Sequence, residues 1–237
     1  MAQSSLLSTC APVVNGETLR LTLLNDCGVP VTGTATRVAV TESFVEVQNS
    51  PQYEDGQRFL LRTAGGDPCV NQIAPAFLNW FQTTTSVCTI DPSVIAMIMG
   101  MEQIGAVTGT GFVIDDALLS RTYAMETWQP VAGAGACSAA GVQQYLYSVW
   151  FANFDTRLGD TTISNDTFTL PWNAKTKAAP ANWLAQMNAL MTAISQTTPG
   201  TYLGTATQAQ ITGAHFASNF TSSPPPTAYC GLSTSTV

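Results

Sequence analysis

Charged residues are scarce in this chain of 237 residues: only 10% are Asp, Glu, Lys or Arg, against about 25% in an ordinary soluble domain. Two of them are lysines, Lys175 and Lys177, the arginines are scattered, and the formal net charge is −7. Proteins that grip nucleic acid need clustered Lys and Arg to displace the counterions of phosphate. The composition therefore excludes that class of protein.

Long hydrophobic runs are also missing. The longest, Val94 to Met101, has 8 residues, whereas a membrane-spanning helix needs about 20. The first ten residues lack the basic start and the apolar stretch of a secretion signal. We therefore expect a soluble protein without a membrane partner.

Metal-ligand spacing is absent as well. The chain has one histidine, His215, and six cysteines without any C-x-x-C, namely Cys10, Cys27, Cys69, Cys88, Cys137 and Cys230. This pattern lacks the clustered ligands of a zinc site. An even number of cysteines is compatible with disulfides, but a long chain without a secretion signal favours a reducing compartment, so we expect buried free thiols.

No catalytic constellation stands out. A Ser-His-Asp site would have to use His215, yet there is no G-x-S-x-G, and Gly213 to Phe216 looks like strand. The pairs Asp115-Asp116 and Glu54-Asp55 are more natural as turn residues than as glycosidase carboxylates. Gly109-Thr110-Gly111 has no Lys and no following helix, so it is not a phosphate loop. We expect no enzyme and no cofactor.

What the chain has in abundance is threonine, 33 residues, within a composition that is 45% hydrophobic. Thr is enriched in strands, and β-sandwiches and barrels reach about 200 to 250 residues as one unit. We predict a mainly β fold, a β-sandwich or barrel with a short flanking helix and a second helix near the C-terminal third. The expected organisation is an N-terminal arm (1–18), the β domain (19–180) with a long hairpin (42–67), and a C-terminal helix and extended arm (181–237) packed on the same domain.

Alternation of apolar and polar residues locates the first strands. Leu19 to Leu23 reads as a strand with one buried face. Glu42 to Gln48 places Val45 and Val47 on a core face and its acidic residues on a wet face. Asp55-Gly56 is a strong hairpin signal, and we expect a return strand from Arg58 to Thr63. Gly65 to Pro68 should end this hairpin.

Further strands and two helices follow. The predicted strands are Ala76–Val87, Gly111–Ile114, Ala117–Trp128, Tyr145–Phe154 and Thr161–Leu170. Tyr145 to Phe154 is apolar on both faces and should be central. Asp91 as N-cap, Pro92 and Gly100 frame a short helix over Ser93 to Met99, and a 3.6-residue period predicts a helix from Asn182 to Ile194.

A charge-poor surface is tolerable when copies of the same protein cover it, so self-assembly is the function that composition favours. Several landmarks also resemble, in order, the major tail tube proteins of long, non-contractile-tailed bacteriophages of the actinobacteriophage type. They are Leu19 to Leu23 with Asp26 to Pro30; Phe44 to Val47 with Glu54-Asp55-Gly56; Cys69-Val70; Cys88 to Pro92 with Met99-Gly100; Gly111-Phe112; and Pro226 to Gly231. The chain departs from that family at Cys88-Thr89, where Cys-Gly is frequent, and in the stretch Asn182 to Ile194.

The resemblance implies a virion structural protein without enzyme activity. Six protomers would close into a ring, and the hexameric rings would stack into a tube through which genome DNA passes on ejection without specific binding. Implied partners are the protein itself, the tape measure protein, the tail terminator and the distal tail protein. The implied location is the tail tube of the virion, after assembly in the host cytoplasm.

The segment Glu42 to Asp67 carries five acidic residues and two arginines, a local balance of −3. Because an acidic wall repels phosphate, these acids fit a channel lining; the alternative is an ordinary solvated hairpin face. The lumen-facing candidates are Glu42, Glu46, Glu54 and Asp55. The expected core of the ring-closing hairpin is Val45, Val47, Phe59 and Leu61.

Two other classes remain open. An exported β-sandwich adhesin or carbohydrate-binding protein would share the Thr-rich composition, with Trp80, Trp128, Trp150 or Trp172 stacking on sugars. The missing export signal counts against it. A β-fold hydrolase is the third possibility.

Overall fold

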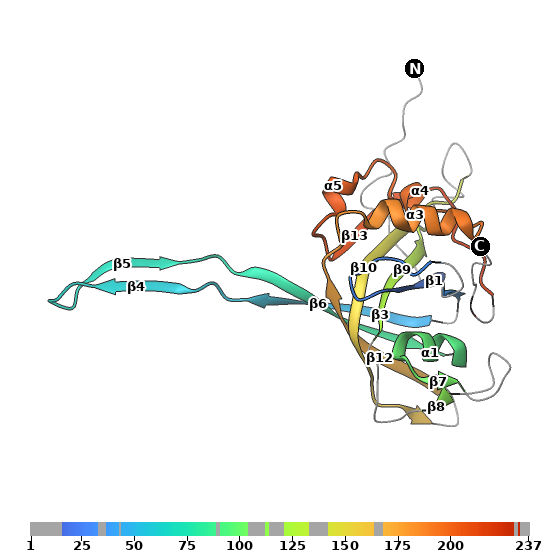
Figure 1. Ribbon diagram of the computed structural model, residues 1–237, viewed down its shortest axis with the longest axis horizontal. Helices are drawn as coiled ribbons and strands as arrows, with labels where there is room; N and C mark the ends of the chain where they lie inside the picture. The colour runs from blue at the N-terminus through green and yellow to red at the C-terminus, as the bar shows by residue number, and fades with distance from the viewer. Residues whose placement is uncertain are drawn as a thin grey trace, which may run out of the picture.

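The computed structural model describes residues 16–32, 37–42, 44–88, 91–103, 112–113, 121–132, 142–163, 168–229 and 232. Its centre is a nine-stranded antiparallel sheet with the order β2-β1-β9-β10-β12-β6-β3 (Figure 1). These strands are β1 (Thr18–Leu24), β2 (Val38–Thr41), β3 (Phe44–Glu54), β6 (Phe77–Val87), β9 (Thr122–Pro130), β10 (Tyr145–Leu158) and β12 (Phe168–Lys177). In addition β13 (Phe216–Thr221) pairs with the first half of β10, and β11 (Thr162–Ile163) pairs with β12. The predicted mainly β fold with a few short helices is confirmed.

The sheet is strongly curled. β2 and β3 lie at opposite ends of its strand order, yet Thr41 and Phe44 are only three positions apart in sequence. Three residues span at most roughly 11 Å, so the two ends of the sheet must approach each other. The enclosed side holds one core cluster, which includes Leu19, Tyr123 and Trp172.

Helix α1 (Pro92–Met99) packs into this enclosed core, as its apolar sequence requires. Its predicted ends are confirmed. The Asp91 carboxylate accepts from the backbone N–H of Ser93 at 2.9 Å, and Gly100 closes the helix in the left-handed region with φ 71°. A residue with a Cβ is strained in that conformation, which explains the glycine.

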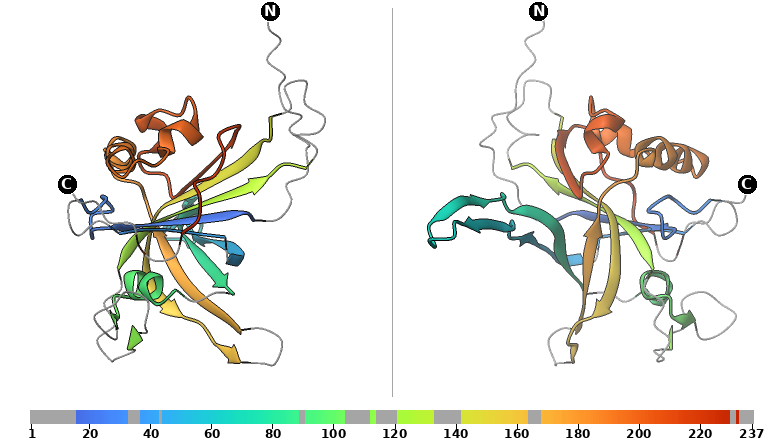
Figure 2. Two further views of the ribbon diagram at one scale, coloured as in Figure 1. Left: turned by 90° about the vertical axis from the view of Figure 1, so that its right-hand side faces the viewer. Right: turned by 60° about the vertical axis from the view of Figure 1, so that its left-hand side comes forward.

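A layer of helices covers the outer face of β1, β9 and β10 (Figure 2). It comprises α3 (Trp183–Ala193), which confirms the helix predicted over 182–194, together with α4 (Pro199–Leu203) and α5 (Gln208–Ile211), which were not predicted. The second core cluster lies beneath, with Trp128, Tyr147 and Phe151 from the sheet against Trp183 and Met187 of α3. Within the described residues, none of the helices is both long enough and apolar enough to cross a membrane.

The helical layer overturns one expectation. The alternation in Leu19 to Leu23 predicted one buried and one wet face, but all seven residues of β1 are buried. Arg20 and Thr22 lie on the face that the helices cover, the same face as Leu24, and Arg20 donates to the carbonyl of Thr197. The alternation of apolar and polar residues within one strand does not show that helices about 170 residues further along the chain bury its second face.

The expected hairpin turn at Asp55-Gly56 is also wrong. The chain continues outward through β4 (Arg58–Arg62), turns between Thr63 and Asp67, and returns through β5 (Pro68–Ile73). Gly66 supplies the positive φ of 92° that this turn needs. A Cβ on Gly56 would instead collide with the carbonyl of Ala74, so Gly56 is needed for a close approach of the two strands.

The remaining strand predictions are partly right. The strand expected over 161–170 is two strands, β11 and β12, and β12 runs on to Lys177. β8 (Phe112–Val113) pairs with β7 (Glu102–Gln103), while the other positions of the strand expected over 111–114 lie outside the described residues, as do 117–120 of the one over 117–128. Tyr145 to Phe154 is central as predicted, because β10 pairs with three strands.

The cysteines differ from expectation. Cys27 and Cys69 carry free thiols, but these side chains and that of Cys88 are exposed rather than buried. Cys27 lies in the turn after β1, and Cys69 lies in β5, where none of the elements that the structure describes covers it. Cys10, Cys137 and Cys230 are outside the described residues.

Candidate functional site

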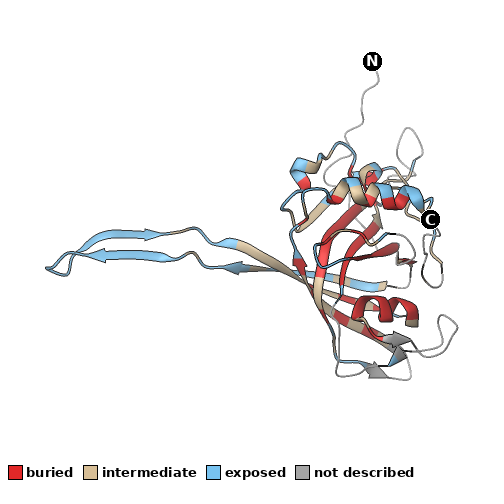
Figure 3. Cartoon of the chain, viewed as in Figure 1, coloured by how far each residue is buried: buried red, intermediate tan, exposed pale blue. Residues whose placement is uncertain are grey.

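A two-stranded ribbon, here called the arm (residues 53–77), projects from the body (Figures 1 and 3). It consists of the ends of β3 and β6 followed by β4 and β5. Every residue of β4 and β5 is exposed. From Pro51, which pairs with Phe81 at the body, to Gly65 at the turn is 14 residues, or roughly 45 Å at about 3.3 Å per residue.

Both faces of the arm carry exposed apolar side chains, and Arg58 lies on one of them. Phe59 and Leu61 share a face with their cross-strand partners Gln72 and Val70. Phe59 is 54% exposed and Leu61 64%. The opposite face carries Leu60 and Ile73, which are 39% and 67% exposed, together with Arg58, whose Nε donates to Oδ1 of Asn71 at 3.0 Å. An isolated two-stranded ribbon is at best marginally stable in water, and clustered exposed apolar side chains mark interaction sites.

The hairpin core expected from the sequence is therefore largely wrong for a single chain. Phe59, Leu61 and Val45 are exposed, Val45 by 57%, and only Val47 packs against the core. At Val45 the cause is a β-bulge: Phe44 pairs with Val87 and Glu46 with Ser86, so Val45 is an extra residue. The bulge turns Phe44 and Val47 inward and Val45 outward.

The four acidic candidates are all exposed, but one chain does not bring them together. Glu42 joins β2 to β3, Glu46 lies on β3 within the body, and Glu54 and Asp55 lie on the arm. Glu46 and Glu54 are eight residues apart along the strand, or roughly 26 Å. Glu54 accepts from Nδ2 of Asn79 at 3.2 Å.

A second exposed surface is the outer face of β3, β6, β12 and the end of β10, here called the open sheet face. Its cross-strand rows contain half-buried or exposed polar residues, and the described helices do not cover it (Figure 2). The rows are Gln48, Thr84, Asn173 and Arg157, and then Ser50, Gln82, Lys175 and Phe154.

Both lysines of the chain lie on the open sheet face. Lys175 Nζ is 2.7 Å from Asp155 Oδ2, and Lys177 Nζ is 4.6 Å from the ring centroid of Phe154. Arg157 also pairs with Asp155, at 3.1 Å. The hydrogen bond from Lys175, with a smaller contribution from Arg157, lowers the pKa of the Asp155 carboxyl. Glu46 lies at the β3 margin of the same face.

The four tryptophans considered for sugar stacking are mostly buried. Trp128 and Trp172 are 0% and 1% exposed and Trp150 is 4% exposed, so three of the four candidates are core residues. Only Trp80 is half-buried at the surface, and Lys175 Nζ lies 5.6 Å from its ring centroid.

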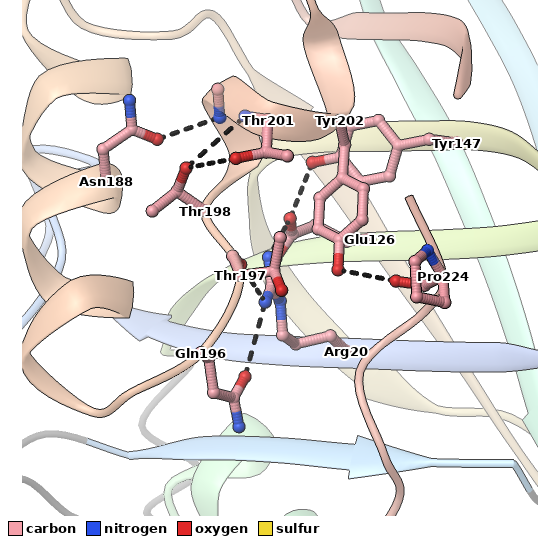
Figure 4. A network of polar contacts seen from close by, with 11 residues as sticks. Arg20, Glu126, Tyr147, Asn188, Gln196, Thr197, Thr198, Thr201, Tyr202 and Pro224 are labelled. Atoms are coloured by element: carbon pink, nitrogen blue, oxygen red, sulfur yellow. Dashed lines mark hydrogen bonds and ion pairs between the residues drawn. The ribbon is translucent and has the colours of Figure 1, made fainter. Parts of the chain in front are cut away.

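An ion pair is buried beneath the helical layer (Figure 4). Arg20 binds Glu126 through Nε at 2.7 Å and through NH2 at 2.6 Å, and both side chains are 0% exposed. Arg20 NH1 donates to the carbonyl of Thr197 at 2.9 Å, and the Tyr147 hydroxyl donates to Glu126 at 2.6 Å. The pair thus joins β1, β9 and β10 to the segment between α3 and α4.

Burial acts on the pKa values of this network. Burial alone would lower the pKa of Arg20, but the Glu126 carboxylate outweighs it, and the pKa is raised. Burial first and Glu126 second raise the pKa of the Tyr147 phenol. The sequence did not reveal this pair, since its only signal is one charged residue in each of two apolar strands.

His215 is held as a structural residue. Its Nδ1 is 2.9 Å from the Thr176 hydroxyl, and burial lowers the pKa of the imidazole. Across the described ranges, no three His, Cys, Asp or Glu side chains gather where they could hold a metal ion.

No protein-family model matches the chain, and no curated protein matches it.

Proposed function

We propose that this protein is a structural virion protein that assembles with copies of itself into stacked rings, the tail tube of a bacteriophage. The observation that carries the proposal is the arm, which extends roughly 40 Å from Tyr53 to Gly65 and presents Phe59, Leu61 and Val70 to solvent in the single chain. Such a ribbon gains stability when another surface covers its apolar face.

A second copy is the simplest cover. Each chain offers one arm and one body, so every copy gives a contact and receives one. Contacts of this head-to-tail kind close into a ring when the rotation between copies closes. The low charge of the chain and the ordered tail tube landmarks in its sequence also support this function, and six copies per ring follow from that resemblance alone.

Deletion of the arm tests the proposal. The backbone N–H of Ala74 donates to the carbonyl of Gln57 at 3.0 Å, so residues 58–73 can be replaced by Asn-Gly, a two-residue hairpin turn. Full-length protein should form rings or tubes in negative-stain micrographs. The deleted chain should remain folded and monomeric by light scattering.

Single-face variants give a sharper comparison. Phe59→Gln with Leu61→Gln removes two exposed apolar side chains from one face, whereas Leu60→Gln removes one from the same strand on the opposite face. The double variant should assemble at least tenfold less readily, and Leu60→Gln should behave like wild type. Strictly monomeric full-length protein across a concentration series would refute the proposed function.

The acidic candidates extend the proposal to the channel. Glu46→Lys with Glu54→Lys should change the free energy of unfolding by less than about 0.5 kcal/mol per site, because both side chains are exposed. Assembled tubes of this variant should retain DNA in a salt-sensitive manner, since each added phosphate contact contributes about one released counterion. Asp160→Lys, an exposed site between β10 and β11, is the control. Equal retention by wild-type and double-Lys tubes would place these acids outside the channel.

A further inference from the structure

Strand β2 is an edge strand of the sheet, at the end opposite β3. Among the described residues its only strand partner is β1. The Leu23 N–H donates to the carbonyl of Arg37 at 2.9 Å, so Arg37 faces β1. Along an antiparallel strand, successive residues direct their backbone N–H and C=O groups to opposite sides. Val38 and Val40 therefore present their carbonyls to the outer side, where a further strand could add.

One residue of the C-terminal segment occupies both carbonyls. The backbone N–H of Tyr229 donates to Val40 at 3.2 Å, and the Tyr229 hydroxyl donates to Val38 at 2.9 Å. Gln196 Nε2 lies 3.5 Å from the same hydroxyl. Further back, the Tyr202 hydroxyl donates to the carbonyl of Pro224 at 3.1 Å (Figure 4). Residues 224–229, here called the strap, thus lead from the helical layer at Tyr202 to the edge of β2 at Tyr229.

The strap is loosely packed. An apolar cavity of about 90 Å³ remains between it and the core, lined by Leu19, Leu21, Val94 and Ile95 among others, with Tyr229 in its wall. The residues of the strap are half-buried or exposed. Three of them are consecutive prolines, Pro224 to Pro226, which have no N–H to donate. Segments with few buried contacts open at low free-energy cost.

We propose that the edge of β2 is an interaction surface for a second copy of this chain, and that the strap closes it in the free subunit. An incoming strand would donate backbone N–H groups to Val38 and Val40 in place of Tyr229, and one of its apolar side chains could fill the cavity. Tyr229 occupies both outward carbonyls of β2, one of them through its side chain, so the strap protects the edge in the free subunit. This inference rests on the proposed self-assembly, which supplies the second copy.

Two variants and one control test the strap. The first is the chain truncated after Ser222, and the second is Tyr229→Phe, which loses the bond to Val38 but keeps the backbone bond to Val40. Thr227→Ala changes an exposed strap residue and is the control. Near-ultraviolet circular dichroism establishes that each variant is folded.

The first readout is amide hydrogen exchange at residue 229. In the free subunit this amide should be protected, and Tyr229→Phe should exchange about fivefold faster, since one hydrogen bond fewer holds the strap. In assembled particles the protection should be lost. A residue 229 that is equally protected in free and assembled protein would overturn the proposal.

The second readout is the concentration at which association begins, measured by light scattering. The truncated chain should associate at a concentration at least tenfold lower than wild type, Tyr229→Phe at an intermediate one, and Thr227→Ala at the wild-type value. A synthetic peptide of residues 222–229 should suppress association of the truncated chain. A truncated chain that associates no more readily than wild type would refute the strap, whereas full-length protein that never assembles would refute the proposed function.

Discussion

Removing the charge of Glu126 should destabilise the fold more than any surface substitution. Glu126→Gln keeps the size of the side chain and an oxygen that can accept from Arg20, but it leaves the guanidinium without its counter-charge. Arg20 and Glu126 are both 0% exposed, so water cannot replace the lost carboxylate. Breaking a buried ion pair on one side costs about 3 to 5 kcal/mol.

An ion pair at the surface provides the control. Arg157 pairs with Asp155 at 3.1 Å, but its side chain is 73% exposed, and pairs of this kind contribute about 0 to 1 kcal/mol. Arg157→Gln should therefore be close to neutral. The double variant Arg20→Met with Glu126→Leu should be less destabilised than Glu126→Gln, because it leaves neither charge buried.

Urea unfolding followed by tryptophan fluorescence measures these differences. Trp128 is a suitable reporter, since the guanidinium carbon of Arg20 lies 5.3 Å from its ring centroid. For a protein of this size each kcal/mol corresponds to about 2 to 4 °C in Tm, so Glu126→Gln should lower Tm by roughly 6 to 20 °C. A loss within 1 kcal/mol of that for Arg157→Gln would refute the assignment of an uncompensated buried charge.

Four further outcomes are expected. Val47→Asp should destabilise the fold by several kcal/mol because Val47 packs on the core, while Val45→Asp should be tolerated at its 57% exposed site; equal losses in urea unfolding would contradict the bulge. Gly56→Ala should disrupt the base of the arm, since its Cβ would meet the Ala74 carbonyl, and amide exchange in β4 and β5 should rise. The single imidazole, His215, should titrate by NMR below its usual pKa of about 6.5, because burial lowers that pKa. The free energy of unfolding should therefore be unaffected above pH 6.5 and should fall as the pH drops below that value. An NMR titration midpoint at or above 6.5 would contradict the burial. Cys69 should react with an alkylating reagent in the native, unreduced protein, because its thiol is exposed and free; mass spectrometry that finds it unlabelled would count against this.

Features specified by neighbouring residues could be predicted from the sequence. The start and end of α1 follow from Asp91, Pro92 and Gly100, all within one short segment, and their geometry is the predicted one. The central position of β10 follows from apolar residues on both of its faces. In each case the deciding residues lie inside the element.

Features specified by distant segments could not. Asp55-Gly56 has the composition of a tight turn, but Gly56 is needed beside Ala74, and the reversal occurs about ten residues later. Arg20 looks like a solvent-facing strand residue until Glu126, 106 positions away, and the helical layer are placed around it. The bulge at Val45 likewise depends on the register with β6.

The strand order also dictates a sequence of events during synthesis. Leu24 pairs with Thr122, and the partners in the rest of β1 are further apart still in sequence. At about 5 to 20 residues per second, β1 waits roughly 5 to 20 s on the ribosome before β9 is made, and β13 completes the sheet only at residue 221. The arm, in which Arg62 pairs with Pro68, can close long before that. The nascent chain can therefore form the arm while its first strand is paired with β2 but still lacks β9 on its other side, and the period in which that side can mispair is set by translation speed.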